Sequence, residues 1–410
     1  MPAMSETAPH LRCDVLVIGA GPAGSACAQV LARAGLDVLL CDRQVFPRDK
    51  VCGDGLIADA HRALARLGLL DAVLARATHA SRLACHAPRA GRLDLPATLA
   101  VLPRRELDEL LRGAAVAAGA RWLAPVCFER LACDAAGRVN GARLLQRDGE
   151  PCQVSARWTV LATGADARAL EAAGMCDRRA PSGMALRGYV QGQGSGLEPD
   201  ALQVVWHRAL RGGYGWIFPA GAQGFNVGVG YMRREGHEQV ADAPNLRDLL
   251  ATFARIHPPA QALLHGGVAP GRFKGAPLRC SLDGARKARP GLLVAGEAAG
   301  STYLFTGEGI GKAMESGLAA AAAAAQMDAQ GDAGVCGTYE RAMQALRPRF
   351  AAYALAHRFN ERPWMVDLII WRARHNAALR GRLAGVLDES EDPGRLASAR
   401  GLLGAFLRPG

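Results

Sequence analysis

The sequence predicts an α/β protein in which a Rossmann-type nucleotide-binding domain is interrupted by a β-rich domain and followed by a helical region. Three observations lead to this fold class. A strand, a glycine-rich turn, a helix and a second strand follow one another over residues 13–42. Short β-type runs separated by Gly and Pro fill residues 182–280, and alternating strand and helix patterns return at 291–317. Alternating elements form parallel sheets, so the interruption indicates an inserted second domain.

The individual elements follow from the hydrophobic periodicity of the chain. Strands are expected at 13–19, 37–42, 121–132, 138–147 and 158–164, and helices at 23–35, 57–75 and 105–120. Residues 291–300 begin as a strand that leads into a long helix, and residues 335–410 are mostly helical in pattern. The predicted division is 1–180 and 285–330 for the nucleotide-binding domain, 181–284 for the β-rich substrate-binding domain and 331–410 for the helical C-terminal region.

The composition excludes several functional classes. The 410 residues carry a net charge of +11, almost entirely from arginine, because lysine occurs only at positions 50, 274, 287 and 312. No basic run or basic stripe with interleaved aromatics accompanies this charge, so nucleic-acid binding is not expected. The eleven cysteines show no CxxC pair or metal-ligand spacing, so no metal site is expected. With no signal-peptide pattern and no uncharged apolar run of about 18 residues, we expect a cytoplasmic protein with reduced thiols.

The segment GAGPAG supplies Gly19, Gly21 and Gly24 at the spacing of a dinucleotide-binding turn. The first glycine permits a tight turn, the second lets backbone amides reach a pyrophosphate, and the third lets helix and strand pack closely. The start of the following helix favours the anionic phosphates. Asp42 ends the second strand, where its carboxylate can accept hydrogen bonds from ribose hydroxyls. An acid at this position argues against a 2′-phosphate, so the expected ligand is FAD or NAD.

The second alternating segment distinguishes FAD from NAD. GLLVAGEAAGSTYLFTGEGIGKAMESG (291–317) leads from a strand into a helix and places Glu297 at the strand end. A carboxylate there can bond a sugar-like hydroxyl, as the ribityl chain of a flavin requires. Gly307 and Gly309 then open the helix and direct backbone amides at one point, which favours negative charge such as that on N1 of a reduced flavin. The sequence therefore predicts FAD, held non-covalently because no His or Cys lies in a known flavin-attachment context.

Together these motifs resemble the geranylgeranyl reductase family, within the hydroxylase-like FAD proteins. GAGPAG with Asp42, FPRDKVCG (46–53), Arg104 in an RxxLD pattern and GEAAG…TGEGI occur in the family's order, over roughly residues 13–320. The resemblance implies FAD contacts from Ala23, Asp42, Cys52, Gly53, Gly55, Arg104, Val126, Glu297, Gly309 and Ile310. Arg43, beside Asp42, is expected in the same site. Two positions depart from the pattern: Glu297 replaces the usual Asp, and Thr163-Gly164 replaces the Asp-Gly pair of hydroxylases.

The segment GYGWIFPAGAQGFNVGVGY (213–231) predicts one wall of a substrate pocket. On a strand, Tyr214, Trp216 and Phe218 share one face and form an aromatic wall. In the next run Gly228 and Gly230 share a face and leave a bare strip of sheet. This combination favours a pocket for an elongated apolar group, with ordinary core packing as the alternative. YxWxFP followed by GxG is also similar to the reductase family's motif, which implies a cavity for a lipid chain.

Three functions are compatible with these motifs. The first is reduction of C=C bonds in a prenyl or other elongated apolar substrate. The alternatives are a flavin-dependent monooxygenase or dehydrogenase of a secondary metabolite, and a non-catalytic flavin-binding protein. A halogenase is not favoured, because GYGWIFP replaces the WxWxIP of flavin halogenases and no lysine lies between Lys50 and Lys274. No second GxGxxG turn follows a strand, so electrons are expected from transiently docked NAD(P)H, from a ferredoxin or from another donor protein.

Cys52 is the leading candidate for a catalytic residue. Gly53 and Gly55 follow it where the chain is expected to pass the flavin ring, and in the family that this sequence resembles the cysteine of this motif lies at the active site. We expect the thiol to position or protonate the substrate carbon, with Arg48 and Lys50 able to lower its pKa. Tyr214 or a bound water is the next candidate for the acid.

The C-terminal region offers one further pattern. Trp364, Leu368 and Trp371 lie at helical spacing and form one apolar face. Packing between helices is the favoured interpretation. The alternatives are that the region helps to close the substrate pocket, or that it rests on the inner face of a membrane, which would make the protein peripheral to that membrane.

Overall fold

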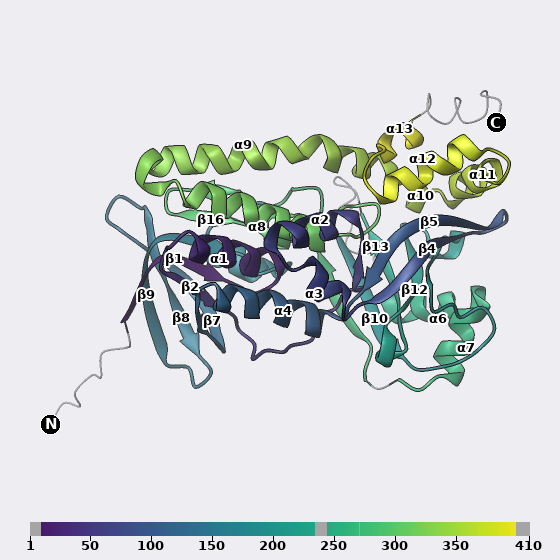
Figure 1. Ribbon diagram of the computed structural model, residues 1–410, viewed down its shortest axis with the longest axis horizontal. Helices are drawn as coiled ribbons and strands as arrows, with labels where there is room; N and C mark the ends of the chain where they lie inside the picture. Colours follow the sequence, from purple (N-terminus) through teal and green to yellow (C-terminus); the bar gives the residue numbers. More distant parts are fainter. Residues whose placement is uncertain (1–9, 234–243, 270, 399–410) are drawn as a thin grey trace.

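The structure, a computed structural model, describes residues 10–233, 244–269 and 271–398 (Figure 1). The absence of a signal-peptide pattern was inferred from the N-terminal residues, and residues 1–9 lie outside the described residues.

The first sheet is of the parallel Rossmann type. It contains β1 (His10–Ile18), β2 (Val38–Cys41), β6 (Arg121–Leu123), β9 (Pro151–Leu161), β15 (Ala288–Arg289) and β16 (Leu292–Val294), joined by the hairpin of β7 (Val126–Cys133) and β8 (Val139–Gln146). The order is β15-β16-β9-β1-β2-β6, and β16, β9, β1, β2 and β6 run parallel. The continuous apolar runs at 15–18 and 38–41 are fully buried, as parallel strands covered on both faces require.

Helices cover this sheet and lie around the second one. The helices before the β-rich segment are α1 (Pro22–Arg33), α2 (Ala58–Leu67), α3 (Leu70–Leu74), α4 (Arg104–Ala117) and α5 (Ala167–Ala172). Within and after it come α6 (Leu246–Ile256), α7 (Pro258–Gly266), α8 (Ile310–Ala324) and α9 (Met327–Ala356). Helix α1 packs between α4 and α8, and α9 packs along α8 (Figure 1). The single helix expected over 57–75 is two helices, because Gly68 ends α2 in the left-handed conformation with φ of 71°.

The second sheet has the order β14-β10-β13-β12-β11-β4-β5-β3. Its strands are β3 (Gly55–Leu56), β4 (Thr78–Ala87), β5 (Gly91–Val101), β10 (Gly183–Val190), β11 (Ala201–Val205), β12 (Gly213–Pro219), β13 (Phe225–Met232) and β14 (Lys274–Leu278). The β4–β5 hairpin was not among the expected elements. Strands β3, β4 and β5 come from the chain assigned to 1–180 yet pair into the sheet of 181–284, so the proposed substrate-binding domain gains them.

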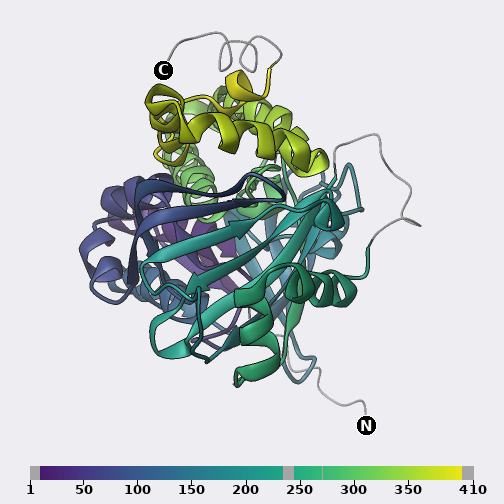
Figure 2. The ribbon, with the colours of Figure 1, turned by 90° about the vertical axis from the view of Figure 1, so that its right-hand side faces the viewer.

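The helical C-terminal region lies over one face of the second sheet (Figure 2). It consists of α10 (Arg358–Glu361), α11 (Pro363–Arg374), α12 (Ala377–Leu387) and α13 (Pro393–Ala397), after the end of α9. An apolar layer between the two includes Leu93, Val204, Ile369 and Ile370. Polar bonds hold the helices in place: Asp367 accepts hydrogen bonds from the backbone amides of Arg89 and Ala90 at the tip of the β4–β5 hairpin. The helices α10 to α13 therefore cover this face of the second sheet, and they are called the helical roof below.

One close approach in the first domain brings the backbones of α8 and the start of α1 together. Gly317 of α8 faces the backbone of α1, and a Cβ at this position would lie 2.1 Å from the carbonyl oxygen of Ala23. A side chain there would push α8 away from the first turn of α1. The glycine is thus required by packing between backbones, because no side chain could move aside.

We predict that Gly317→Ala destabilises the protein by about 1–3 kcal/mol, the usual cost of overpacking a core. Gly113→Ala is the matched control, because Gly113 lies in α4 with no atom within 4 Å of its would-be Cβ. That control should be neutral or stabilising by about 1 kcal/mol, since alanine favours a helix interior over glycine. Urea unfolding measures both; equal stabilities of the two variants would contradict the packing argument.

Candidate active site

A single cavity of about 820 Å³ extends from the first sheet to the helical roof. At one end it is lined by the dinucleotide turn, Asp42 and the loop that carries Cys52. At the other end it is lined by aliphatic side chains of the second sheet and of α11 and α12, among them Leu95, Val204 and Ile369. The cavity therefore joins a polar, glycine-rich part to an apolar chamber.

The dinucleotide turn has the geometry that its glycines predict. Gly19 has φ of 103°, and a Cβ there would lie 2.4 Å from the carbonyl oxygen of Ala162, so only glycine fits. A Cβ at Gly24 would lie 1.8 Å from the carbonyl oxygen of Gly19, which is the close approach of helix and strand expected of the third glycine. Gly21 faces the cavity, and its would-be Cβ meets only the Arg48 side chain at 3.7 Å.

Asp42 is fixed by its own neighbours. Its Oδ2 accepts a hydrogen bond from the backbone amide of Ala20 at 2.9 Å, and its Oδ1 accepts one from that of Gln44 at 2.9 Å. A carboxylate has about four lone-pair sites, so capacity is left for hydroxyl groups from the cavity. The residue is buried and still lines the cavity. The carboxylate is thus fixed by two backbone amides beside the cavity.

Asp108 forms ion pairs with two arginines that line this end of the cavity. Arg104 forms a two-pronged pair with it, with Nε to Oδ1 and Nη2 to Oδ2 both at 2.7 Å. Arg48 reaches the same carboxylate at 2.9 Å and lies 3.9 Å from Asp42. Lys50 pairs with Glu297 at 3.2 Å. The two cations upstream of Cys52 therefore pair with carboxylates across the cofactor end of the cavity.

The loop that carries Cys52 is bound to the second sheet by side chains that sequence reasoning missed. The amide nitrogen of Asn226 donates to the Cys52 carbonyl at 2.8 Å, and Arg187 Nε donates to the same carbonyl at 3.2 Å. The indole of Trp216 donates to Asn226 Oδ1 at 2.9 Å. The sequence offered one sign of this role, because Asn226 is an amide residue within the otherwise apolar run FNVGVGY. One hydrogen-bonded chain thus connects the aromatic wall to the thiol loop.

Asp54, between the two glycines of this loop, reinforces the same junction. It has φ of 63° and is fully buried. Its Oδ2 accepts hydrogen bonds from the Tyr189 hydroxyl and from the Asn226 amide, and Oδ1 accepts one from the Arg104 backbone amide at 3.3 Å. Burial raises the pKa of Asp54 to about 6, although nearby Arg187 opposes the shift. The loop is therefore rigidly positioned at the boundary of the two sheets.

The glycines of the loop make room for the aromatic wall. A Cβ at Gly53 would lie 3.2 Å from the ring of Phe218, and one at Gly55 would lie 3.7 Å from the same ring. The expectation attributed these glycines to the flavin ring alone. Both line the cavity, but the atoms nearest to them belong to the second sheet.

The bare strip expected at Gly228 and Gly230 is only partly bare. Strand pairing places Trp216 opposite Gly228 and Tyr214 opposite Gly230. A Cβ at Gly228 would lie 2.4 Å from the Trp216 ring and 2.5 Å from the carbonyl oxygen of Leu186, so the expectation of open space there is wrong. Gly230 lines the cavity, and its would-be Cβ has only ordinary contacts at 3.6 Å and beyond. The indole covers one glycine and leaves the other open.

The structure brings almost all the predicted site residues to one cavity. The predicted residues that line it are Gly19, Gly21, Ala23, Asp42, Arg43, Cys52, Gly53, Gly55, Arg104, Val126, Tyr214, Trp216, Phe218, Gly230, Glu297, Gly307, Gly309 and Ile310. Gly24 and Gly228 lie behind the lining, where they allow close packing. A further lining residue, Glu308, was not predicted, although an acid between two glycines of the TGEGI turn was a visible signal.

Comparisons with known proteins identify the family. Residues 12–194 match the family model described as FAD binding domain. The chain is 34% identical over 328 residues to a menaquinone reductase of Mycolicibacterium smegmatis, covering 76% of each chain. It is 30% identical over 306 residues to digeranylgeranylglycerophospholipid reductase 1 of Methanopyrus kandleri, covering 74% of this chain and 78% of that one. The chain belongs to the geranylgeranyl reductase family. It is an FAD-dependent oxidoreductase.

Solved structures share the fold of this family member over nearly its full length. A geranylgeranyl bacteriochlorophyll reductase-like protein from Thermoplasma acidophilum has a TM-score of 0.72 at 22% identity, covering 97% of this chain and 96% of that one. A flavin-dependent brominase has a TM-score of 0.74 at 20% identity, covering 96% of this chain and 99% of that one. At these identities the likeness concerns the fold alone.

The residues present fit FAD. Gly21 leaves backbone amides open to the cavity at the start of α1, which suits a pyrophosphate. Asp42 lines the cavity with free acceptor sites that suit a ribose, and Gly309 caps the start of α8, whose first residue Ile310 also lines the cavity. Glu297 lines the same space with Lys50 and the Thr302 hydroxyl beside it, the latter at 3.4 Å. We expect these groups to hold the cofactor without a covalent bond.

We predict that Asp42→Ala raises the Kd for FAD by about 10- to 100-fold, because each hydrogen bond to a charged group contributes about 1.5–3 kcal/mol. Asp14→Ala is the control: Asp14 also accepts a backbone amide across β1 and β2, from Asp37 at 3.0 Å, but does not line the cavity. Fluorescence titration of the apoprotein measures both.

Equal FAD affinity of the two variants would show that Asp42 does not contact the cofactor. Acid precipitation of the yellow holoprotein provides an independent readout. Colour in the supernatant is expected for non-covalent FAD, and colour retained in the pellet would contradict it.

Proposed function

We propose that this flavoprotein saturates C=C bonds of an elongated apolar substrate of the prenyl type. The observation that carries the proposal is the continuity of the cavity, which leads from the cofactor end past Cys52 into an apolar chamber. An aliphatic chain has no polar groups to satisfy, so a chamber lined by aliphatic side chains stabilises it mainly by excluding water. The names of two relatives, a menaquinone reductase and a digeranylgeranylglycerophospholipid reductase, agree with such a substrate.

The chain's own residues supply the walls of the reaction chamber. Reduced FAD supplies a hydride. Tyr214 and Phe218 form one wall, and Val366 and Ile370 of α11 form the opposite one. We propose that Cys52, fixed through its carbonyl by Asn226, positions the double bond. We also propose that electrons reach the cofactor from an external donor, either NAD(P)H or a ferredoxin.

The proposal is tested by anaerobic mixing of dithionite-reduced holoprotein with a geranylgeranyl lipid. We expect reoxidation of the flavin and a product heavier by two hydrogens for each saturated bond, measured by absorbance and mass spectrometry. Gly230→Leu should abolish this turnover and keep FAD bound, because the added side chain enters the cavity at an open position.

Gly275→Leu is the matched control, since Gly275 lies on β14 outside the cavity and a Cβ there has only ordinary contacts at 3.6 Å and beyond. A wild-type flavin that stays reduced in the presence of prenyl lipids, or a Gly230→Leu variant with normal turnover, would contradict the proposal.

We further propose that the outer face of α11 rests on an anionic membrane surface. Trp364 and Trp371 are 59% and 54% exposed, so the favoured expectation that they pack between helices is wrong. Arg362 and Arg374 on the same helical segment are exposed. The opposite face of α11 lines the apolar chamber, so an apolar substrate would have a short path from the bilayer. Among the described residues, no helix has the length and apolar character needed to cross a bilayer.

Flotation with anionic phospholipid vesicles at low salt tests this surface. The double variant Trp364→Ser/Trp371→Ser should lower the partition coefficient about tenfold or more, because burying each indole contributes on the order of 1 kcal/mol or more. Val268→Ser, which removes an exposed apolar side chain elsewhere, should have no effect. Wild-type protein that does not float at low salt would dismiss the membrane contact.

A further inference from the structure

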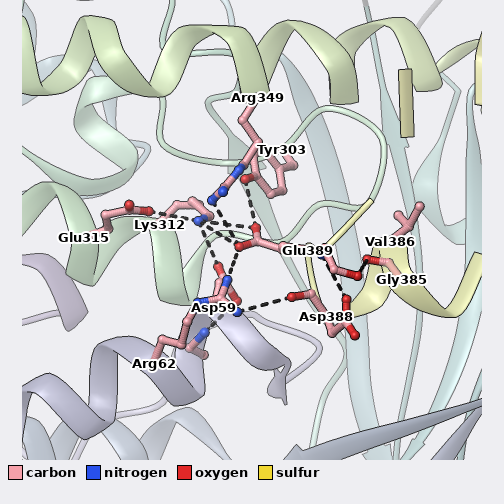
Figure 3. Close-up of polar contacts among 12 residues, drawn as sticks. Asp59, Arg62, Tyr303, Lys312, Glu315, Arg349, Gly385, Val386, Asp388 and Glu389 are labelled. Atoms are coloured by element: carbon pink, nitrogen blue, oxygen red, sulfur yellow. Dashed lines mark hydrogen bonds and ion pairs between the residues drawn. The ribbon is translucent and has the colours of Figure 1, made fainter. Parts of the chain in front are cut away.

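Behind the TGEGI turn lies a buried polar cluster centred on Glu389 (Figure 3). The Glu389 side chain is 2% exposed, and the residue has φ of 62° after the end of α12. Its carboxylate pairs with Arg62 of α2, with Lys312 of α8 at 3.3 Å and with Arg349 of α9 at 3.1 Å. The Tyr303 hydroxyl donates a fourth contact at 3.0 Å. Four separate segments of the chain therefore meet at one carboxylate.

Lys312 connects this carboxylate to two others. Its ammonium group is 2% exposed and lies 2.8 Å from Glu315, 3.3 Å from Glu389 and 3.7 Å from Asp59. Asp59 Oδ2 is buried and has no hydrogen-bond donor within the described residues. At the start of α2, the cluster therefore contains a carboxylate oxygen to which no described group donates a hydrogen bond.

Glu308 lies between this cluster and the cavity. It is part of the cavity lining, and Gly307 beside it approaches Tyr214, whose hydroxyl would lie 3.2 Å from a Cβ at that glycine. The carboxyl group of Glu308 interacts electrostatically with Tyr214 on the cavity side and with Asp59, Glu389 and Lys312 on the cluster side. No other carboxyl group among the described residues both lines the cavity and interacts with the cluster.

A count of charges indicates that this environment retains a proton. The carboxyl groups of Asp59, Glu308, Glu315 and Glu389 share the cations of Arg62, Lys312 and Arg349. If all were ionised, the four negative charges would exceed the three positive ones, and the side chains of Asp59, Lys312 and Glu389 at the centre of the cluster are almost completely shielded from water. Two carboxylates that share a buried site favour protonation of one of them.

The directions of the pKa shifts agree with the count. Burial, followed by the charges of Asp59 and Glu389, raises the pKa of Glu308 to about 8. Burial also raises the pKa of Asp59 to about 6, with Lys312 opposing it. Burial moves the pKa of Tyr214 far above its usual value, and the Tyr214 hydroxyl already donates to the Thr306 carbonyl. An effective general acid has a pKa near the working pH, which favours Glu308 over Tyr214.

We propose that Glu308 is a further catalytic residue, the general acid that protonates one carbon of the substrate double bond. The inference rests on the proposed function. In the step, the π bond breaks, one carbon accepts the hydride that the reduced cofactor supplies, and the other forms a C–H bond as the O–H bond of Glu308 breaks. The carboxylate that forms is stabilised by Lys312 and regains a proton from solvent between turnovers. Cys52 then has a positioning role.

The sign of the pH dependence follows from this role. The acid must be protonated, so product formation falls as pH rises through the pKa of Glu308, about 8. Several charged or titratable groups interact with Glu308 or with its neighbour Glu389: Asp59 from α2, Tyr214 from β12, Lys312 from α8, Tyr353 from α9, and Glu389, which Arg62 of α2 pairs with. Glu389→Gln removes a like charge and keeps the shape, so it should move the loss of product formation to lower pH.

The experiment compares reduced wild type, Glu308→Gln, Glu308→Asp and Cys52→Ala with a geranylgeranyl lipid under anaerobic conditions over a range of pH. We expect Glu308→Gln to bind FAD and to be reduced normally, but to form product at least about 100-fold more slowly, within the range usual for a general acid. Glu308→Asp should keep slow turnover with the alkaline limb. Glu340→Gln, on the exposed face of α9, is the matched control and should behave as wild type.

Difference infrared spectroscopy of the FAD-loaded protein gives a readout that does not depend on turnover. A protonated-carboxyl band should titrate near pH 8 in the wild type and be missing in Glu308→Gln. Wild-type rate and an unchanged alkaline limb in Glu308→Gln would overturn the inference, and loss of that limb in Cys52→Ala instead would assign the proton to the thiol. If the wild type forms no product from prenyl lipids, the proposed function fails, and the infrared titration still decides whether Glu308 carries the proton.

Discussion

The hydrogen bonds of Asn226 are the constraint on which the site depends. This fully buried amide accepts from the indole of Trp216 and donates to the Cys52 carbonyl and to the Asp54 carboxylate. Both hydrogens of its nitrogen are donated and its oxygen accepts a hydrogen bond, so the orientation of the amide is fixed. Leaving this buried amide unpaired would cost about 1–3 kcal/mol. The thiol loop comes from the chain next to the first sheet, and Asn226 comes from the second. Their junction holds the cofactor end of the cavity against the aromatic wall.

A second junction joins the helical roof to the FAD-binding part. Glu389 brings cations of α2, α8 and α9 to the segment that follows α12, while Asn360 of α10 accepts from the Trp206 indole at 2.8 Å and donates to the Phe305 carbonyl at 2.8 Å. The roof and the TGEGI turn are therefore held by the same network. Any displacement of the roof would leave buried charges without partners, which is costly. This explains how the apolar chamber keeps its shape beside a polar cofactor site.

The motifs of the cofactor site could be predicted from the sequence because they lie within one strand–turn–helix–strand unit of the chain. Gly19 has the left-handed backbone of the turn itself, Gly24 contacts Gly19 five residues before it, and Asp42 ends the strand that follows. Gly228 was misjudged because its neighbour is set by strand register: Trp216 lies directly opposite it. The faces of two separate strands can be predicted from periodicity, but their pairing cannot.

Other features depend on contacts between distant parts of the chain. Glu389 is 77 residues from Lys312 and 327 residues from Arg62, so no spacing pattern could indicate their cluster. The β4–β5 hairpin is visible in the alternation of Leu93 and Leu95 with polar neighbours, yet its place in the second sheet follows from its pairing with β11. Helical spacing indicated an apolar face on α11 but not that Trp364 and Trp371 remain exposed.

The central claim is that one cavity holds the flavin and an apolar chain side by side, with the chain beneath the helical roof. A crystal structure of the holoprotein with a saturated prenyl lipid tests this most directly. The account predicts that the flavin lies against Asp42 and the Gly19–Gly24 turn, and that the lipid runs from Cys52 and Glu308 between β11 and α11. A lipid bound outside this chamber, or a chamber filled by side chains when the flavin is bound, would contradict it.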